Sequence, residues 1–241
     1  MPEIQISSND WLAISLRNGT IGMFYLQDRS LWQCLRLNDE QINDLHRSLM
    51  KFSPNGQIFV CNGQSKQLYV YIRSDWTKTQ VAWTLHRKIV SRNLPLSIDL
   101  TNRMFFLADI DGDIYRIDLT LNDQKDDLLV TSEYCIMKTK SMSLDIIFNP
   151  INATNAMLIT ADRDDQIRLS HYPNTLDIVG YCRGHTEFIS HMKLIDQQHI
   201  LSASADGEYS SILQFNVSYS NFRNNPSLAS VYMCSTSFIP C

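Results

Sequence analysis

The sequence predicts an all-β protein built as a β-propeller, and two observations lead to that prediction. One pattern, an apolar strand, a short turn and a second apolar strand, recurs four times along the chain. No segment of convincing length carries apolar residues at helical spacing. Aligning Phe52, Ile98, Phe148 and Met192 gives steps of 46, 50 and 44 residues, close to the roughly 40–45 residues of a four-stranded propeller blade.

Each repeat is predicted to open one blade. The repeats cover residues 49–60, 96–107, 144–159 and 189–202. An earlier strand pair, 11–16 and 20–25, surrounds Asn18-Gly19, the preferred two-residue hairpin turn. We therefore expect about four blades plus an N-terminal strand pair within a propeller domain, 1–215. The tail 216–241 is rich in Ser and Asn and shows no blade pattern.

Composition excludes several classes of protein. Apolar residues make up 44% of the 241 residues, enough for a substantial core. The net charge of −4 argues against a chain that binds nucleic acid by its overall charge. No run of about 18 apolar residues predicts a membrane span, and the N-terminus lacks the pattern of a secretory signal. Six scattered cysteines without a C-x-x-C pair favour reduced thiols in the cytosol or nucleus.

A dense charge cluster lies between two predicted strands. The strand at 157–160 is followed by Asp162-Arg163-Asp164-Asp165, and the segment 166–170 alternates polar and apolar residues like a half-buried strand. On a hairpin turn, Asp side chains can bond nearby backbone N–H groups, and the charges of this run project into water. From the residues alone, the cluster is either a solvated turn with a local Asp–Arg pair, worth ~0–1 kcal/mol, or a docking surface.

Two segments resemble a known family. The run Ala161-Asp-Arg-Asp-Asp-Gln-Ile-Arg-Leu-Ser170, continued by Tyr172-Pro173 and by Gly184-His-Thr-Glu-Phe-Ile-Ser190, closely resembles the WD-repeat non-catalytic subunit of the eukaryotic tRNA (guanine-N7) methyltransferase. The segment Ala108–Tyr115 is similar to that family's Ala-Asp-x-x-Gly-Asp-x-Tyr stretch. The resemblance covers roughly residues 50–207 and implies a WD-repeat propeller. Because family members close seven blades, it also implies that the ring predicted here is incomplete.

The resemblance implies a scaffold rather than an enzyme. Its expected partner is a catalytic subunit that binds S-adenosylmethionine and forms N7-methylguanosine in tRNA, as a heterodimer, with tRNA contacted only indirectly or weakly. Carried over by position, the residues expected to bind the partner are Arg163, Asp164, Asp165 and Arg168. Gln166 stands where the family usually has Lys, so one potential salt bridge is lost. We expect a nuclear protein, with the cytosol as the alternative location.

Three further residues are expected to be structural. Gly184-His185 precedes a predicted strand, and Asp206 lies in the next hairpin turn. In WD repeats such a His and Asp meet through a hydrogen bond, worth ~1.5–3 kcal/mol when one partner is charged. After Asp206-Gly207, however, the sequence 208–215 lacks the residues that normally end a WD repeat.

The sequence contains no catalytic, cofactor-binding or metal-binding motif. None of its eight glycines forms G-x-G-x-x-G, and no H-E-x-x-H or G-x-S-x-G occurs. Asp109, Asp111 and Asp113 suggest a calcium loop only weakly, because the EF-hand order is absent, and a hairpin turn is the preferred interpretation. The basic run 83–92 is interpreted either as a surface loop between blades or as a phosphate contact.

Two alternatives to the scaffold stay open at this stage. One is a WD-repeat adaptor in an unrelated complex, which would use the same fold but a different surface. The other is a truncated product or faulty gene model that lacks the family's activity.

Overall fold

The all-β prediction is confirmed by the computed structural model of the chain. Its strands form five sheets, and the only helical element in the described part of the chain is one 3-10 turn, η1 (Ser132–Tyr134). No helix among these residues is long and apolar enough to cross a membrane. The described residues are 3–16, 20–28, 30–37, 49–63, 66–74, 83–119, 127–151, 156–197, 199–207, 209–215 and 231–234.

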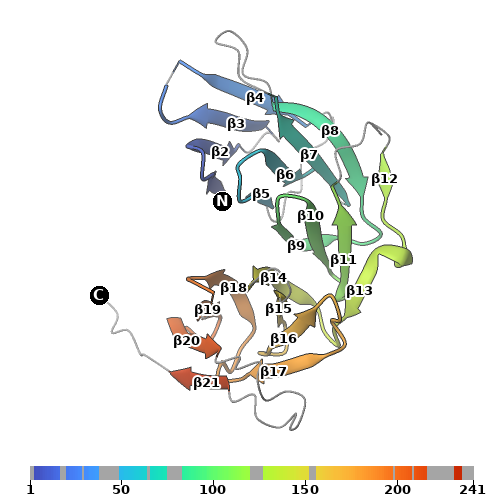
Figure 1. The fold of residues 1–241 in the computed structure, drawn as a ribbon, viewed down its shortest axis with the longest axis vertical. Helices are drawn as coiled ribbons and strands as arrows, with labels where there is room; N and C mark the ends of the chain where they lie inside the picture. The colour runs from blue at the N-terminus through green and yellow to red at the C-terminus, as the bar shows by residue number, and fades with distance from the viewer. Residues whose placement is uncertain are drawn as a thin grey trace. The chain divides into compact units, whose positions relative to one another are not determined.

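The first two sheets contain β1 to β8, and the second also includes the later strand β12 (Figure 1). The first has the order β1-β2-β3-β4: β1 (Ile4–Ile6), β2 (Trp11–Ser15), β3 (Thr20–Tyr25) and β4 (Trp32–Arg36). The second has the order β12-β8-β7-β6-β5: β5 (Met50–Phe52), β6 (Ile58–Asn62), β7 (Gln67–Arg73), β8 (Trp83–Val90) and β12 (Leu128–Leu129). β12 pairs with β8 in parallel, whereas β5 to β8 are antiparallel neighbours.

Three more sheets follow in chain order. The third has the order β13-β11-β10-β9: β9 (Pro95–Leu100), β10 (Met104–Asp109), β11 (Asp113–Asp118) and β13 (Cys135–Lys138). The fourth is β14 (Ser143–Pro150), β15 (Ala156–Asp162), β16 (Ile167–Tyr172) and β17 (Ile178–Cys182). The fifth is β18 (Ile189–Leu194), β19 (His199–Ser204), β20 (Tyr209–Phe215) and β21 (Val231–Cys234).

The predicted repeats coincide with the first two strands of these sheets. β5 and β6, β9 and β10, β14 and β15, and β18 and β19 lie within the four repeat segments. The N-terminal pair corresponds to β2 and β3, and β1 and β4 extend it to a four-stranded sheet. The turn predicted at Asn18-Gly19 lies outside the described residues. Segment 216–241, for which no blade strand was predicted, contains β21, which pairs with β20.

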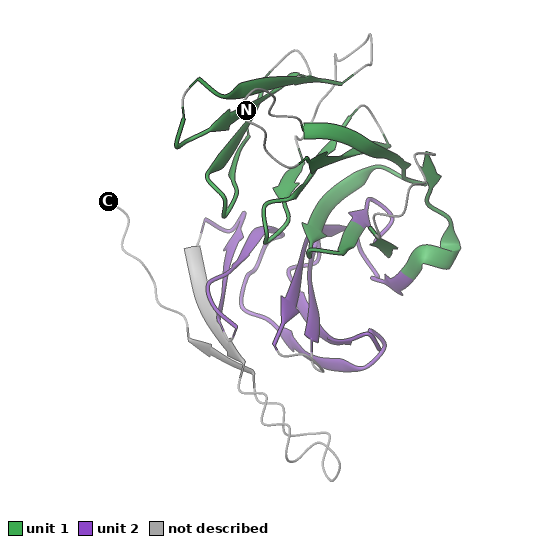
Figure 2. Ribbon diagram, turned by 45° about the horizontal axis from the view of Figure 1, so that its top comes forward, with its two compact units in different colours: residues 1–107, 115–135 green, residues 108–114, 136–241 purple. Residues whose placement is uncertain are grey.

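The chain divides into two compact units (Figure 2). Unit 1 comprises residues 1–107 and 115–135, and unit 2 comprises residues 108–114 and 136–241. Unit 1 contains two clusters of buried apolar side chains, one of them built around Trp11, Phe59 and Trp83. Unit 2 contains a third cluster, in which Ile159 and Leu169 of the fourth sheet pack with Ile189 and Ile200 of the fifth.

Hydrogen bonds link residues that are one repeat apart. In unit 1, Asn9 Nδ2 donates to the Asn55 carbonyl oxygen at 2.6 Å, 46 residues away. In unit 2, the Met192 backbone N–H donates to Asp145 Oδ2 at 2.6 Å, 47 residues away. These separations match the spacing of the sequence repeat, so the polar contacts within each unit follow the same period as the strands.

Candidate docking hairpin

The charged cluster lies on the turn between β15 and β16, and Asp162 organises it. Asp162 Oδ1 accepts the backbone N–H groups of Asp164 at 3.0 Å and Gln166 at 3.1 Å. The backbone N–H of Asp162 donates to the Gln166 carbonyl oxygen at 3.0 Å, which closes the turn. An Asp side chain is suited to this role because its short carboxylate reaches backbone donors two residues on.

The same turn recurs at other hairpins. In each of these turns, the side-chain oxygen of the first residue accepts a hydrogen bond from the backbone N–H of the residue two positions later. The first residues are Ser7, Asp109, Asp162 and Ser204. The residue three positions after each of these has a positive φ, and these residues are Asp10, Gly112, Asp165 and Gly207. Glycine favours this left-handed conformation, and Asp tolerates it better than most residues do. The charged hairpin is therefore a standard turn of this protein with unusual side chains.

Charges on this turn are not neutralised locally. Arg163 and Asp164 are exposed and Asp165 is half-buried. Within the described ranges, none of the three makes a salt bridge, so the local Asp–Arg pair expected for a solvated turn is not formed there. The pKa of Asp162 is raised above its ordinary value, chiefly because the carboxyl is partly buried. The two backbone hydrogen bonds act in the opposite direction, and the nearby charges of Asp164 and Asp165 raise the pKa further.

Arg168 lies on β16, and its side chain turns along the sheet rather than toward the charged turn. Its Nε donates to Ser170 Oγ at 2.9 Å, and its Nη2 donates to the Thr175 carbonyl oxygen at 2.8 Å. Thr175 is buried in the loop between β16 and β17, and its hydroxyl donates to the carbonyl oxygen of Ile136 on β13. The structure thus groups Arg163, Asp164 and Asp165 but gives Arg168 a different set of contacts.

His185 and Asp206 are brought together in the fifth sheet's hairpin region. His185 Nδ1 lies 2.9 Å from Asp206 Oδ2, and His185 Nε2 lies 2.9 Å from Ser202 Oγ. The backbone N–H of Thr186 also donates to Asp206 Oδ2, at 3.1 Å. The side chains of His185 and Asp206 are only 5% and 8% exposed. This buried clasp ties the segment before β18 to the β19–β20 turn, while Gly184 stays exposed beside it.

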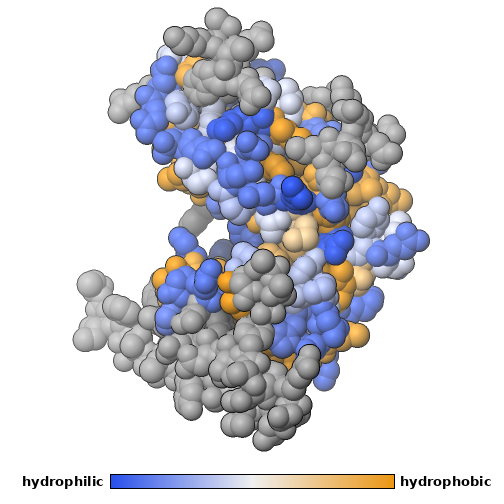
Figure 3. All heavy atoms as spheres, in the orientation of Figure 1, coloured by the Kyte–Doolittle hydropathy of each residue, from blue (hydrophilic) through white to orange (hydrophobic). Residues whose placement is uncertain are grey.

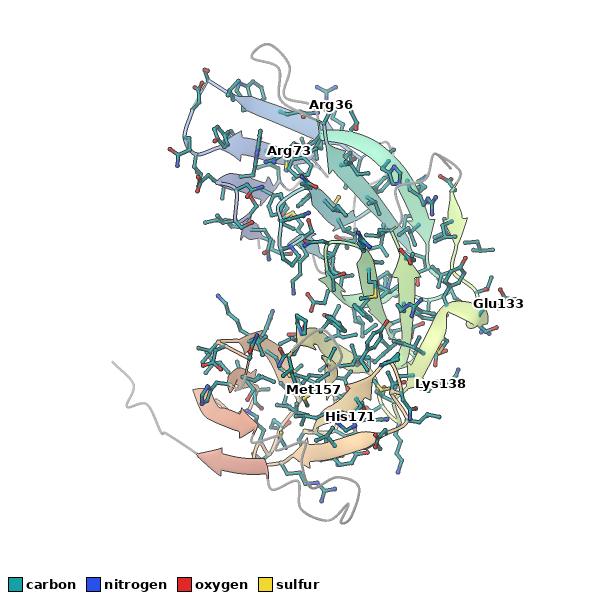
Figure 4. All side chains as sticks on the ribbon, in the orientation of Figure 1. Arg36, Arg73, Glu133, Lys138, Met157 and His171 are labelled. Carbon is teal, nitrogen blue, oxygen red and sulfur yellow. The ribbon has the colours of Figure 1, made fainter. Side chains whose placement is uncertain are left out.

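Other polar candidates from the sequence have structural partners. Asp109 Oδ1 accepts the backbone N–H groups of Asp111 and Asp113, each at 3.0 Å. Asp113 pairs at 2.9 Å with Lys138, which is labelled in Figure 4. Asp109 to Asp113 therefore form a hairpin turn, as preferred from the sequence. Among the described residues, no group of three His, Cys, Asp or Glu side chains is arranged to hold a metal ion.

The basic run 83–92 is a strand for most of its length rather than a loop. β8 covers Trp83–Val90 and pairs with β7 along its whole length. Lys88 lies 5.4 Å from the centre of the Tyr69 ring, and Lys66 donates to the Arg92 carbonyl oxygen at 2.6 Å.

Hydrophilic and hydrophobic residues are interspersed over the face of the protein seen in Figure 3, among the residues that the structure describes.

A family model matches the part of the chain that carries these features. Residues 136–213 match the family model described as the tRNA methyltransferase TRM82 WD40 domain. The chain is similar to the non-catalytic subunit of a tRNA (guanine-N7) methyltransferase. The match to this subunit family includes the charged hairpin, Arg168 and the His185–Asp206 clasp, and it lies within unit 2. The resemblance drawn from the sequence is thereby confirmed.

Curated relatives carry the same description. The tRNA (guanine-N(7)-)-methyltransferase non-catalytic subunit wuho of Drosophila melanogaster is 33% identical over 158 residues, which is 64% of this chain and 34% of that protein. The wuho subunit of Drosophila erecta is 57% identical over 49 residues, which is 20% of this chain and 12% of that protein. The chain thus spans about a third of the length of the first relative it matches.

A solved structure supports the fold. The β-propeller domain of Myceliophteria thermophila Cps50 (Swd1) superimposes with a TM-score of 0.69, covering 97% of this chain and 70% of that chain. Its sequence identity is 14%, so this likeness bears on the fold alone. The propeller prediction is confirmed at the level of fold class.

Sequence reasoning missed the residues that hold Arg168. Thr175 and Ser170 are buried, and neither was singled out. The Tyr172-Pro173 pair, which begins the loop containing Thr175, entered the sequence reasoning only through the family resemblance. A short polar residue within a loop next to an arginine-bearing strand is too common a pattern to have identified this contact.

Proposed function

We propose that this chain is a non-catalytic scaffold that binds the catalytic subunit of a tRNA (guanine-N7) methyltransferase and stabilises its active form. The partner supplies S-adenosylmethionine binding and forms N7-methylguanosine in tRNA, while tRNA contacts this chain only indirectly or weakly. The two proteins form a heterodimer in the nucleus. The family match over the charged hairpin, together with the similarity to the wuho subunits, supports this function.

One structural observation carries the proposed interface. Arg163 and Asp164 are held on a turn whose backbone is fixed by Asp162, yet their side chains have no ion-pair partner within the described part of the chain. The backbone of a rigid turn loses little conformational entropy when it docks, and its charges need no internal ion pair to be broken first. The turn is therefore suited to pair with complementary charges on a partner.

Loss of such a charge should weaken the complex measurably. Truncating one partner of a buried interfacial ion pair costs ~2–5 kcal/mol, much of it because the other charge is left unpaired. Asp165 belongs to the same turn and has a left-handed backbone there. Gln166 is uncharged, so docking would use the three residues before it.

Co-expression with the catalytic subunit from the same organism tests the function. We expect the two proteins to elute together from a size-exclusion column at moderate salt and to produce more N7-methylguanosine in tRNA than the catalytic subunit alone. Elution of two separate proteins, or equal methylation with and without this chain, would contradict the proposal. Co-elution that survives removal of the hairpin charges would instead favour an adaptor that uses another surface.

A further inference from the structure

We infer that Arg168 is a positioning residue, which acts on the partner contact by holding the β16–β17 loop so that an apolar strip beside it can dock. This strip consists of Leu176, Ile178 and Tyr181. The inference rests on the proposed function, because the partner is the same catalytic subunit. It differs from the expectation drawn from the sequence, in which the Arg168 side chain itself contacts the partner.

Arg168 is committed to contacts within this chain. Arginine has five N–H donors in a rigid planar arrangement, and two of the Arg168 donors are engaged, by Ser170 Oγ and by the Thr175 carbonyl oxygen. The side chain is half-buried and makes no ion pair with a carboxylate in the described ranges. A guanidinium fixed in this way is better placed to hold a loop than to reach a partner.

The loop that Arg168 holds is tied down at several points. The Thr175 hydroxyl donates to Ile136 on β13, so the middle of the loop is fixed to the neighbouring strand. At its end, His171 on β16 (labelled in Figure 4) bonds Asp177 through its Nδ1 at 2.7 Å and its backbone N–H at 2.9 Å. Asp177 in turn donates its backbone N–H to the Asn174 carbonyl oxygen at 3.0 Å. Arg168 therefore completes a network that sets the path of residues 173–177.

This path exposes apolar side chains beside strand β17, which also contacts β21 and whose Tyr181 ring lies 5.9 Å from the Arg183 guanidinium. Leu176 is 81% exposed, the highest value among the large hydrophobic residues described. Ile178 and Tyr181, on the edge strand β17, are 40% and 41% exposed. Exposed edge strands are usually protected by charged residues or proline against unwanted pairing. An apolar strip on a strand edge is more typical of a surface that a partner covers.

The strip is continuous with the surface proposed to bind the partner. Tyr181 lies directly opposite Arg168 in the β16–β17 ladder, and Arg168 follows the charged turn by three residues. One partner that contacts the charged turn can thus extend along the edge strand β17 to the strip. Such an interface has a polar rim and an apolar centre, which is the usual composition of protein interfaces.

Affinity measurements on the complex of the full chain with the catalytic subunit separate positioning from direct contact. We expect Arg168→Leu, Leu176→Ser and Tyr181→Ser each to weaken binding by roughly tenfold, and Leu201→Ser, an exposed apolar residue on β19, to leave it unchanged. Arg168→Lys keeps the charge but not the planar pair of donors. We therefore expect Arg168→Lys to bind the partner as weakly as Arg168→Leu does. We also expect the salt dependence of the Kd to be the same for the wild type and for Arg168→Leu.

Full recovery of affinity in Arg168→Lys, or a shallower salt dependence in Arg168→Leu, would overturn the inference in favour of direct charge contact. Unchanged binding in Leu176→Ser and Tyr181→Ser would also overturn it. So would a loss of self-association in these two variants with unchanged partner binding, because the strip would then join two copies of this chain.

Hydrogen exchange of the chain alone tests the positioning step without the partner. In Arg168→Leu we expect the backbone N–H groups of Thr175 and Asp177 to exchange faster, whereas those of Asp164 and Gln166 on the charged turn keep their rates. Unchanged exchange at Thr175 and Asp177 would overturn the positioning role. Because this readout needs no partner, failure of the proposed function and failure of this inference are distinguishable.

Discussion

The carboxylate of Asp162 accepts the backbone N–H groups of Asp164 and Gln166 and so fixes the turn that carries the exposed charges. The sequence singled out the residues that follow Asp162, because their charges are visible without a structure. Hydrogen bonds from an Asp side chain of this turn to nearby backbone N–H groups were also predicted, and they are confirmed at Asp162. Which of the Asp residues accepts them was not predicted, because that depends on the turn geometry.

Replacing Asp162 should separate turn geometry from charge. Asp162→Ala removes two hydrogen bonds worth ~0.5–1.5 kcal/mol each, so we expect a loss of about 1–3 kcal/mol of unfolding free energy and weaker partner binding. Asp162→Asn keeps an oxygen acceptor and should retain most of both. Urea unfolding and affinity measurements check this, and equal losses in the two variants would point to the charge instead of the turn.

The pH dependence of stability provides a second test at Asp162. Burial raises its folded-state pKa above the ordinary value of 3.8, so the folded chain holds this proton more tightly than the unfolded chain does. This contribution to stability is fully present below pH 3.8 and is lost as the pH rises through the folded pKa. We expect the wild type to gain stability relative to Asp162→Asn as the pH falls through that window. An opposite trend in urea unfolding would contradict the direction of the shift.

Asp165 has φ of +64°, the conformation that Gly112 and Gly207 adopt at the equivalent positions of their turns. We therefore expect Asp165→Gly to leave the free energy of unfolding nearly unchanged. Asp165→Val has a β-branched side chain, and we expect its free energy of unfolding to fall by about 1–2 kcal/mol. Thermal unfolding of both variants measures this difference. If Val were as stable as Gly, the backbone constraint assigned to this position would be wrong.

At the scale of elements, the His185–Asp206 clasp joins two segments of the fifth sheet region. The His185–Asp206 pair was expected from the resemblance to WD repeats, whereas the contact with the Ser202 hydroxyl was not predicted. His185→Ala leaves the buried Asp206 carboxylate with fewer hydrogen-bond partners. We therefore expect the free energy of unfolding to fall by about 2–3 kcal/mol. His199→Ala is the control, because its Asp196 pair is more exposed. Comparable losses in the two variants during urea unfolding would argue against a special role for the clasp.

Strand faces were harder to predict than strand positions. The alternation in 166–170 indicated a half-buried β16 with polar residues facing water. Ser170 on that polar face is nevertheless fully buried, and its hydroxyl lies 3.9 Å from Met137 Sδ of β13. Inner strands of stacked sheets are covered on both faces, so small polar residues become buried without any change in the alternation. The basic run 83–92 was hard to recognise as a strand because β8 shows no alternation of buried and exposed residues, and only Trp83 and Ile89 in it are buried.

At the scale of the whole chain, the spacing of the repeats predicted the fold class and the starting strands of four sheets. It did not predict that β1 and β4 complete the first sheet, because short strands with exposed apolar residues, such as Ile4 and Ile6, lack the repeat's two apolar runs. Nor did it assign β21 within 216–241. A repeat is visible in sequence only where its core positions recur.

Cysteine reactivity reports on the packing of both units. Cys34 is exposed, whereas Cys61 and Cys182 are buried, and burial raises the pKa of Cys182 to about 12. We expect alkylation of the native chain at pH 8 to modify Cys34 quickly and to leave Cys61 and Cys182 intact until denaturant is added. Mass spectrometry of the digested protein identifies the alkylated cysteines. Rapid labelling of both buried thiols would mean that the two sheets holding them are not packed as described.

The central claim is that the charged hairpin docks on the catalytic subunit. The most direct measurement is the Kd of the complex for the wild type, for Arg163→Ala with Asp164→Ala, and for a control that removes two exposed charges elsewhere in unit 2, Glu187→Ala with Lys193→Ala. Each double variant keeps the net charge of −4. We expect the hairpin variant to bind roughly 30-fold or more weakly than the wild type and the control to have an unchanged Kd. Equal affinity in all three proteins would contradict it.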